Sequence, residues 1–497
     1  MACLAVVLLL TAHTSVWAAE PEPTARPLEE ETMTAILDRD GSDGYSGDFV
    51  LIYNPLLENG ASVRTGDLTG LVETAGGAPV REDIYFETRE GLYSAPDPYV
   101  TDELRQADGY AYDDDDPWQV GFRRVFSVSP YGELAFQVSA VSERCRVWSP
   151  VNPDYGPIEG VDPAYPEILA QEMDRAIPIL EEVFGAAPDP RGDGKMNIFC
   201  FDFNYPATMG FTRTEEIYAE VRISGGRVWQ GNSLPIVHIN SAVVWQEGDL
   251  GLLYLSTAHE IQHSIGIARS GSADFTLWSG KVKTLTEFLS VAAEEVVYPG
   301  AGTFHDLAYW YSESTLWEDL AEDDAWMYLR SNSKRQSGES LFDWSRDESE
   351  NYAAMLLLVN FTENRGGTEA FKHILDRWVE LTETSVVMAD RMHPAQLVWE
   401  ELGYEDYASF VEDFLLSVLL HEDEGPYRLH PFAGYDAAEF DGVENPFSVM
   451  VPIITDKNVT IRLGGYAVIK PVDGVYYPPA TASKDACYVG ITLKQAG

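Results

Sequence analysis

Two histidines and a glutamate stand together in the middle of the chain, in the order His259-Glu260-x-x-His263. If this stretch is helical, the histidines lie four residues apart and project from one face of the helix, one turn above the other. Two imidazoles in that relation can bind one zinc ion, at about 2.0–2.1 Å each. Glu260 stands beside the pair, where its carboxylate can act as a general base on a metal-bound water. The pattern therefore predicts a zinc site built on one helix.

A catalytic zinc ion has three protein ligands and one open position, so a third ligand is required. No histidine occurs in residues 264–274. Glu287 is the candidate, because a charged side chain among apolar neighbours usually needs a partner. The alternative is a glutamate favoured at the start of a helix by the helix dipole. Glu294 and Glu295 follow on the same predicted helix, and either can accept the outer N–H of a ligand histidine, unless they only form a polar face.

Three segments resemble the hyicolysin-like zinc metallopeptidases, a family of the gluzincin group. They are Ala258–His263, Leu285–Ser290 and Asn351–Leu356. The resemblance covers roughly residues 141–420. In gluzincins two histidines and a downstream glutamate bind zinc, and the resemblance implies a cleft between an α/β subdomain and a helical subdomain.

Carried onto this sequence, the resemblance implies that His259, His263 and Glu287 are the zinc ligands and that Glu260 is the catalytic base. A further donor should stabilise the oxyanion that forms when water attacks a peptide carbonyl. Related gluzincins supply a tyrosine from the helical subdomain, and Tyr352 is the candidate here. A tyrosine that only packs at the start of a helix is the alternative.

Two positions depart from the gluzincin pattern. Val291 stands four residues after Glu287, where many gluzincins carry an acid, and Thr286 stands where the family often has asparagine. Both departures concern the surroundings of the ligands and leave the ligands themselves intact.

The chain is strongly acidic. Its 497 residues include 81 acidic and 33 basic ones, which gives a formal net charge of −48. Such a surface repels phosphate backbones and anionic membranes, so we expect no nucleic-acid partner. Solubility, high external salt, several calcium sites or the steering of cationic substrates are all compatible with this charge. The hydrophobic share of 45% is typical of a globular protein.

The first 19 residues have the pattern of a secretory signal peptide, although no lysine or arginine precedes the apolar run. Cys3–Ala12 is almost wholly apolar, and Val16–Ala18 offers small residues for cleavage. No other apolar stretch approaches 18 residues, so we expect a secreted protein without membrane insertion. Cys145, Cys200 and Cys487 remain after cleavage. The first two lie in strand-like runs and are interpreted as buried apolar side chains, with one disulfide as the alternative.

These patterns predict an α+β multidomain protein. Residues 20–37 are predicted to be a mobile leader, and alternating apolar and polar runs over residues 38–150 predict an antiparallel β-sandwich. Residues 151–424 are predicted to form the zinc peptidase catalytic domain, and residues 425–497 a small C-terminal β module.

Apolar residues at helical spacing predict a series of helices around the zinc helix. The expected ranges are 165–184, 281–298, 352–363, 369–380, 394–402 and 405–420.

Three acidic stretches contain several closely spaced carboxylates, at residues 38–48, 113–116 and 189–193. Hard oxygen ligands of this kind can converge on a calcium ion, so structural Ca2+ is a candidate second metal. An acidic turn or solvated loop is the more common use of such residues and is the preferred interpretation at each stretch.

Together these features predict a secreted zinc-dependent metallopeptidase, an endopeptidase that acts on a peptide or protein substrate with Glu260 as general base. An aminopeptidase of the same chemistry is one alternative, and it would need acidic residues at the end of the cleft. A non-catalytic extracellular binding protein that uses its β modules is another. The presence of His259, Glu260 and His263 together disfavours it, because a decayed site usually loses one of the three.

Overall fold

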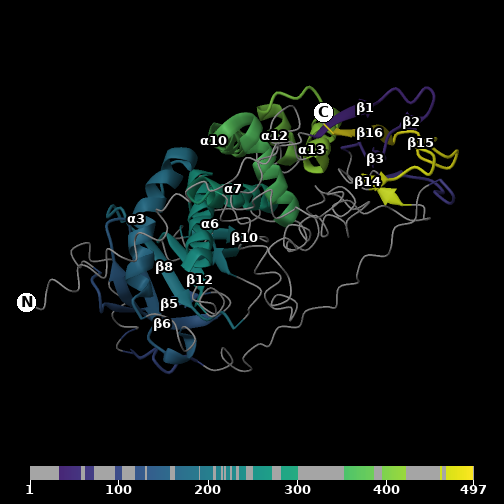
Figure 1. The fold of residues 1–497 in the computed structure, drawn as a ribbon. Coiled ribbons are helices and arrows are strands. Elements are labelled where there is room, and N and C mark those ends of the chain that lie inside the picture. Colours follow the sequence, from purple (N-terminus) through teal and green to yellow (C-terminus); the bar gives the residue numbers. More distant parts are fainter. Residues whose placement is uncertain are drawn as a thin grey trace, which may run out of the picture.

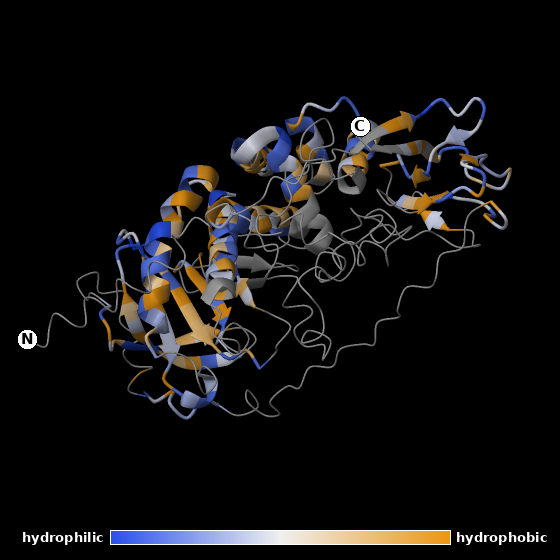
Figure 2. Ribbon diagram, viewed as in Figure 1, coloured by the Kyte–Doolittle hydropathy of each residue, from blue (hydrophilic) through white to orange (hydrophobic). Residues whose placement is uncertain are grey.

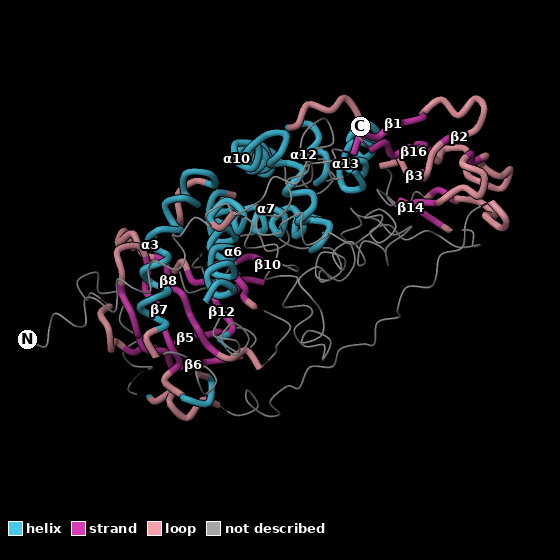
Figure 3. Tube along the Cα trace, viewed as in Figure 1, coloured by secondary structure: helices cyan, strands magenta, loops and turns pink. Residues whose placement is uncertain are grey.

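A computed structural model describes the protein over part of its chain. The described residues are 33–57, 62–71, 96–102, 104, 118–128, 131–156, 163–189, 191–204, 209–213, 217, 220–223, 227–230, 234–241, 250–270, 281–299, 352–384, 394–420, 459–461 and 466–495. Strands lie at the two ends of this assembly and helices lie between them (Figure 3). This mixed helical and β architecture agrees with the predicted α+β class.

A six-stranded sheet forms one end of the molecule (Figure 1). In spatial order its strands are β5 (Arg123–Val128), β6 (Gly132–Val141), β7 (Cys145–Pro150), β8 (Met196–Phe201), β12 (Ile236–Asn240) and β9 (Gly210–Thr212). The three central strands β7, β8 and β12 run parallel, and the outer ones pair antiparallel. We call this the central sheet, because it lies between two hydrophobic cores.

The central sheet separates two hydrophobic cores, because successive side chains of a strand point to opposite faces. Phe199 and Phe201 join Trp148 in an aromatic core on one face. Ile198 and Cys200 join the larger core on the other face, which also contains residues of α3 (Tyr165–Phe184) and α6 (Leu250–Arg269). In Figure 2 the strands of this sheet are largely orange, whereas α3 carries bands of orange and blue.

The remaining helices continue from α6 toward the other end of the chain. They are α7 (Lys281–Val297), α10 (Tyr352–Thr384), α12 (Pro394–Glu401) and α13 (Tyr407–Leu420). The two helices predicted over residues 352–363 and 369–380 are confirmed as the two halves of α10, which is broken at Gly367, where φ is 65°. The other predicted helices are confirmed with ends shifted by at most two residues. Within the described parts of the chain, no helix combines the length and the apolar character needed to cross a bilayer.

The second large sheet pairs strands of residues 33–53 with strands of residues 466–495. Its order is β1 (Met33–Asp38), β16 (Cys487–Gln495), β3 (Phe49–Tyr53) and β14 (Tyr466–Ile469), with all pairs antiparallel. Figure 1 shows β1 in purple beside β16 in yellow. We call this the terminal sheet.

Shorter strands complete the described β structure. Near the terminal sheet, β2 (Tyr45–Ser46) pairs with β15 (Val475–Tyr476), and β4 (Val63–Arg64) pairs with β13 (Thr460–Ile461). The hairpin of β10 (Glu220–Ile223) and β11 (Arg227–Gln230) belongs to the α/β part of the chain.

The sheets require a correction of the predicted domain boundaries. The range 38–150 is predicted to be one β-sandwich, but its strands are divided. β3 belongs to the terminal sheet, β2 and β4 pair in two-stranded sheets, and β5, β6 and β7 belong to the central sheet. The predicted C-terminal module, 425–497, shares a sheet with the N-terminal strands. Residues 33–37, predicted as part of a mobile leader, lie in β1. Local patterns show that a segment is a strand but not which distant strand it pairs with.

The terminal sheet packs on the helices through α13. Glu412 of α13 accepts hydrogen bonds from the hydroxyl of Tyr53 at 2.7 Å and from Nε of Arg39 at 2.6 Å. Apolar side chains of β3, β14 and β16 join the same core as those of α13. The terminal sheet is therefore packed against the helices and is not a separate appendage.

The cysteines and acidic turns have plain structural roles where they are described. Cys145 and Cys200 are buried, as expected, and neither these two nor Cys487 forms a disulfide. Asp189 accepts hydrogen bonds from the backbone N–H groups of residues 193 and 194, and the Asp38 carboxylate likewise caps a turn. These contacts are those of acidic turns, and calcium binding stays a prediction. The run 113–116 and the signal-like residues 1–19 lie outside the described residues.

Candidate metal centre

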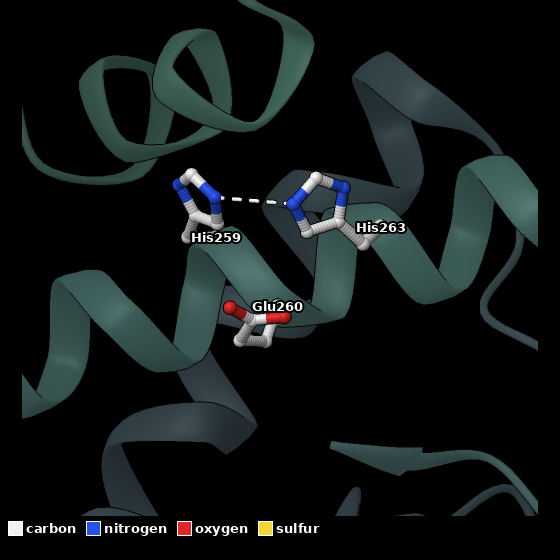
Figure 4. Close-up of side chains that lie close together, drawn as sticks. All are labelled: His259, Glu260 and His263. Atoms are coloured by element: carbon white, nitrogen blue, oxygen red, sulfur yellow. Dashed lines mark hydrogen bonds between the residues drawn. The ribbon is translucent and has the colours of Figure 1, made fainter. Parts of the chain in front are cut away.

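Helix α6 carries the two histidines on adjacent turns, as the sequence predicts. Its apolar residues Leu253, Ile261 and Ile265 enter the large core, which fixes the rotation of the helix. That rotation turns His259 and His263 toward helix α7. Figure 4 shows the two imidazoles next to each other, and their Nε2 atoms lie 3.1 Å apart.

Helix α7 brings Glu287 to the same point. Phe288 and Leu289 are buried in the large core, and Glu287 itself is buried. Its Oε2 atom lies 3.2 Å from Nε2 of His259 and 3.6 Å from Nε2 of His263. The convergence predicted for these three residues is therefore present in the structure.

The three ligand atoms have the spacing that a tetrahedral zinc site requires. Ligands held at about 2.0–2.1 Å in tetrahedral geometry lie about 3.3 Å from one another. The three edges of the triangle measure 3.1, 3.2 and 3.6 Å. A set of two imidazole nitrogens and one carboxylate oxygen is also a usual ligand set for catalytic zinc. The residues present thus fit a zinc ion.

Glu260 is close to the histidines but is held against another element. His259, Glu260 and His263 each offer one possible ligand atom, and these three atoms lie within 4.8 Å of one another. The Glu260 side chain packs under the edge strand β9, where a Cβ added at Gly210 would lie 2.8 Å from Oε1. Thr212 of the same strand donates to the backbone carbonyl of residue 260 at 3.0 Å. Glu287 makes the shorter contacts with the histidines, so it is the stronger candidate for the third ligand, and Glu260 lies beside it.

The outer nitrogen of His259 is held by Glu294. Its Nδ1 lies 2.6 Å from Oε1 of Glu294, and both side chains are buried. This contact decides between Glu294 and Glu295, which the sequence left open. The charge of Glu295 instead adds to burial, the larger cause, in raising the pKa of Glu363 on α10.

Helical phase is the signal that could have identified Glu294. Seven residues make about two full turns of an α-helix, so residues 287 and 294 share a face, whereas residue 295 lies about 100° further round. Sequence reasoning missed Ser290, which contacts the outer nitrogen of His263, and Gln262, which accepts from the Ser290 hydroxyl.

Burial and charge shift the proton equilibria of this cluster in opposite directions. Burial disfavours a charged imidazole, but hydrogen bonds to Glu287 and Glu294 outweigh it and raise the pKa of His259 well above its usual value. Burial also disfavours a charged Glu287, yet His263 and His259 hold the pKa of that carboxyl well below its usual value. For Glu260, burial raises the pKa and the histidines offset it only in part. Without metal, the cluster therefore retains a proton where a cation would bind.

Tyr352 is the first residue of α10, and its side chain lies outside the described residues. Its role as oxyanion donor therefore stays a prediction. His238, which has no second histidine at helical spacing, is a buried core residue. It is stacked on Phe211, with ring centroids 4.3 Å apart.

Comparison with known proteins adds no family to this geometry. No model of a known protein family matches the chain, and a search of curated protein sequences finds no match either. The function of the centre must therefore be argued from its own residues and distances.

Proposed function

We propose that the chain is a zinc-dependent metallopeptidase in which His259, His263 and Glu287 hold the metal and Glu260 is the general base. The observation that carries the proposal is the triangle of ligand atoms, with edges of 3.1, 3.2 and 3.6 Å. Two separate helices converge to make it, and the spacing in the sequence had already selected the same three residues. An apolar residue of similar volume would stabilise the fold at least as well as a buried carboxylate beside two imidazoles. A role in binding a metal explains the carboxylate better than a structural role does.

The chemistry divides between the metal and the chain. A bound zinc ion would lower the pKa of a water ligand to about 7 and polarise a peptide carbonyl. Glu260 would accept the proton that the attacking water loses and pass it to the leaving amine. The packing against β9 restricts the Glu260 side chain, so its carboxylate would meet the substrate in one orientation. Glu294 would hold the ring of His259 in place during this transfer.

The wider proposal is a secreted endopeptidase of the hyicolysin-like type, with Tyr352 as oxyanion donor. It is supported by the three resembling segments and by the signal-like first 19 residues. An aminopeptidase of the same chemistry remains the alternative within enzymes. The substrate in either case is a peptide or protein.

Replacement of Glu260 by glutamine tests the proposal directly. The purified full chain should contain about one zinc ion per molecule, and Glu260→Gln should keep that zinc while losing peptide cleavage by at least about 100-fold. The control is Glu182→Gln, on the exposed face of α3, which should change neither zinc content nor cleavage. Absence of zinc under conditions that preserve bound metal would refute the metal site. Undiminished cleavage by Glu260→Gln would remove Glu260 from its role.

A further inference from the structure

The two candidate ligand histidines are oriented by different chemistry. Nδ1 of His259 faces a carboxylate, which accepts hydrogen bonds when it is ionised. Nδ1 of His263 lies 3.0 Å from the hydroxyl oxygen of Ser290. A hydroxyl can donate or accept, so Ser290 alone would not decide which nitrogen of His263 carries the proton. That choice matters, because only the unprotonated nitrogen can bind a metal.

Gln262 removes this ambiguity. Ser290 donates its hydroxyl proton to Oε1 of Gln262 at 2.6 Å. The hydroxyl has one proton, so its oxygen can only accept from His263, whose Nδ1 must then carry hydrogen. Exposed fractions of 0% for Ser290 and 1% for Gln262 leave no room for water to compete. The lone pair of His263 is thereby left on Nε2, the atom 3.1 Å from Nε2 of His259.

We propose that Gln262 and Ser290 are positioning residues that set the tautomer of His263 and so prepare its Nε2 atom for the metal. The inference rests on the proposed zinc site and extends it to two residues outside the ligand set. Gln262 is next to His263 in sequence but acts on it through Ser290 of helix α7. The pair therefore also ties the ligand helix to the helix that carries Glu287.

Ser264 provides a matched control for this network. It follows His263 directly and is fully buried like Ser290. Its hydroxyl oxygen has no hydrogen-bond partner among the described residues. Ser264→Ala and Ser290→Ala each remove one buried hydroxyl, but Ser264→Ala should not affect His263.

The first test measures zinc affinity by competition with a chelator. Ser290→Ala should bind zinc about 10-fold to 100-fold more weakly, as is usual when the partner of a ligand histidine is lost. Gln262→Met, which keeps the size but loses the acceptor, should also weaken binding. The double variant should be no weaker than Ser290→Ala, because Gln262 acts only through Ser290. Ser264→Ala should bind zinc as the unmodified chain does.

The second test observes the His263 ring by nuclear magnetic resonance in the zinc-loaded full chain. The unmodified protein should show a slowly exchanging Nδ1–H proton, and Gln262→Met should make it exchange faster. This measurement decides the matter even if Ser290→Ala does not fold. Zinc bound through Nδ1, or unchanged affinity and exchange in folded Gln262→Met, would overturn the inference while leaving the zinc site standing. An unmodified chain that binds no zinc would instead refute the proposed function itself.

Discussion

Two clusters of buried or partly buried charge lie on opposite sides of the central sheet, and they are built differently. On the aromatic side, Asp193 accepts from Arg146 at 2.6 Å and from Arg191 at 3.2 Å. The Arg191 guanidinium lies 3.9 Å from the ring centroid of Trp118. On the helical side, the partners of Glu287 and Glu294 are imidazoles. We call these the arginine cluster and the histidine cluster.

The two clusters differ in whether their basic side chains can lose a proton. A guanidinium keeps its charge at every physiological pH, so Asp193 pairs with fixed positive charges, and stacking on Trp118 adds to the arginine cluster. An imidazole can lose its proton and offer a lone pair instead. In the histidine cluster, three atoms that can offer lone pairs converge on one point. In the arginine cluster, two N–H donors converge on one oxygen, Oδ2 of Asp193. The comparison teaches that the kind of atom that converges, a lone-pair donor or an N–H group, separates a candidate metal site from a structural ion pair.

The largest expected effect is stabilisation of the whole chain by zinc. A ligand that binds only the folded state adds about 4 kcal/mol when its free concentration is 1,000 times its Kd. We expect the thermal unfolding temperature of the metal-free chain to rise on zinc addition. Calorimetry with zinc and with magnesium as the control measures this. An equal rise in unfolding temperature with zinc and with magnesium would mean that the histidine cluster is not a zinc site, and the contrast with the arginine cluster would be lost.

The next effect separates the clusters by substitution. Glu287→Ala should weaken zinc binding by more than about 100-fold, since even outer partners of ligands contribute about 10-fold to 100-fold. Asp193→Ala, which removes a carboxylate from the arginine cluster, should leave zinc affinity unchanged. Chelator competition measures both. Unchanged affinity in Glu287→Ala would mean that another residue, with Glu260 as the nearest candidate, completes the site.

The histidine cluster could be predicted because its information is local. The spacing of His259 and His263 matches one helical turn, and Glu287 lies within the next described helix, α7. Gln262 and Ser290 were missed because a buried hydroxyl and amide are common in any core. Their role depends on how α6 and α7 are rotated against each other, which only packing decides.

The sheets were harder to predict than the site. Strand character follows from alternation, and β6 and β8 lie where the pattern placed strands. Pairing follows from contacts between residues far apart, such as the register of Thr34 with Lys494 in the terminal sheet. A predicted boundary at residue 150 therefore divided a sheet that the structure keeps whole.

The smallest effect concerns the pH dependence contributed by Asp193. Burial opposes its ionisation, but hydrogen bonds and charge from Arg146, followed by Arg191, lower the pKa of this carboxyl. A depressed folded-state pKa stabilises the protein above the unfolded value of about 3.9 and loses that contribution as pH falls toward the folded value. Asp193→Asn should therefore cost about 1–2 kcal/mol at pH 7, given a side chain that is 27% exposed, and less near pH 3.

Denaturant unfolding of the two proteins at pH 7 and pH 3 measures this difference. Glu380→Gln, in an exposed pair on α10 with Arg377, is the control and should cost little at either pH. A cost for Asp193→Asn that does not shrink in acid would mean that the carboxylate contributes by packing, since a charge effect must fade as Asp193 takes up its proton. In that case the arginine cluster would not be held by charge, and its contrast with the histidine cluster would rest on geometry alone.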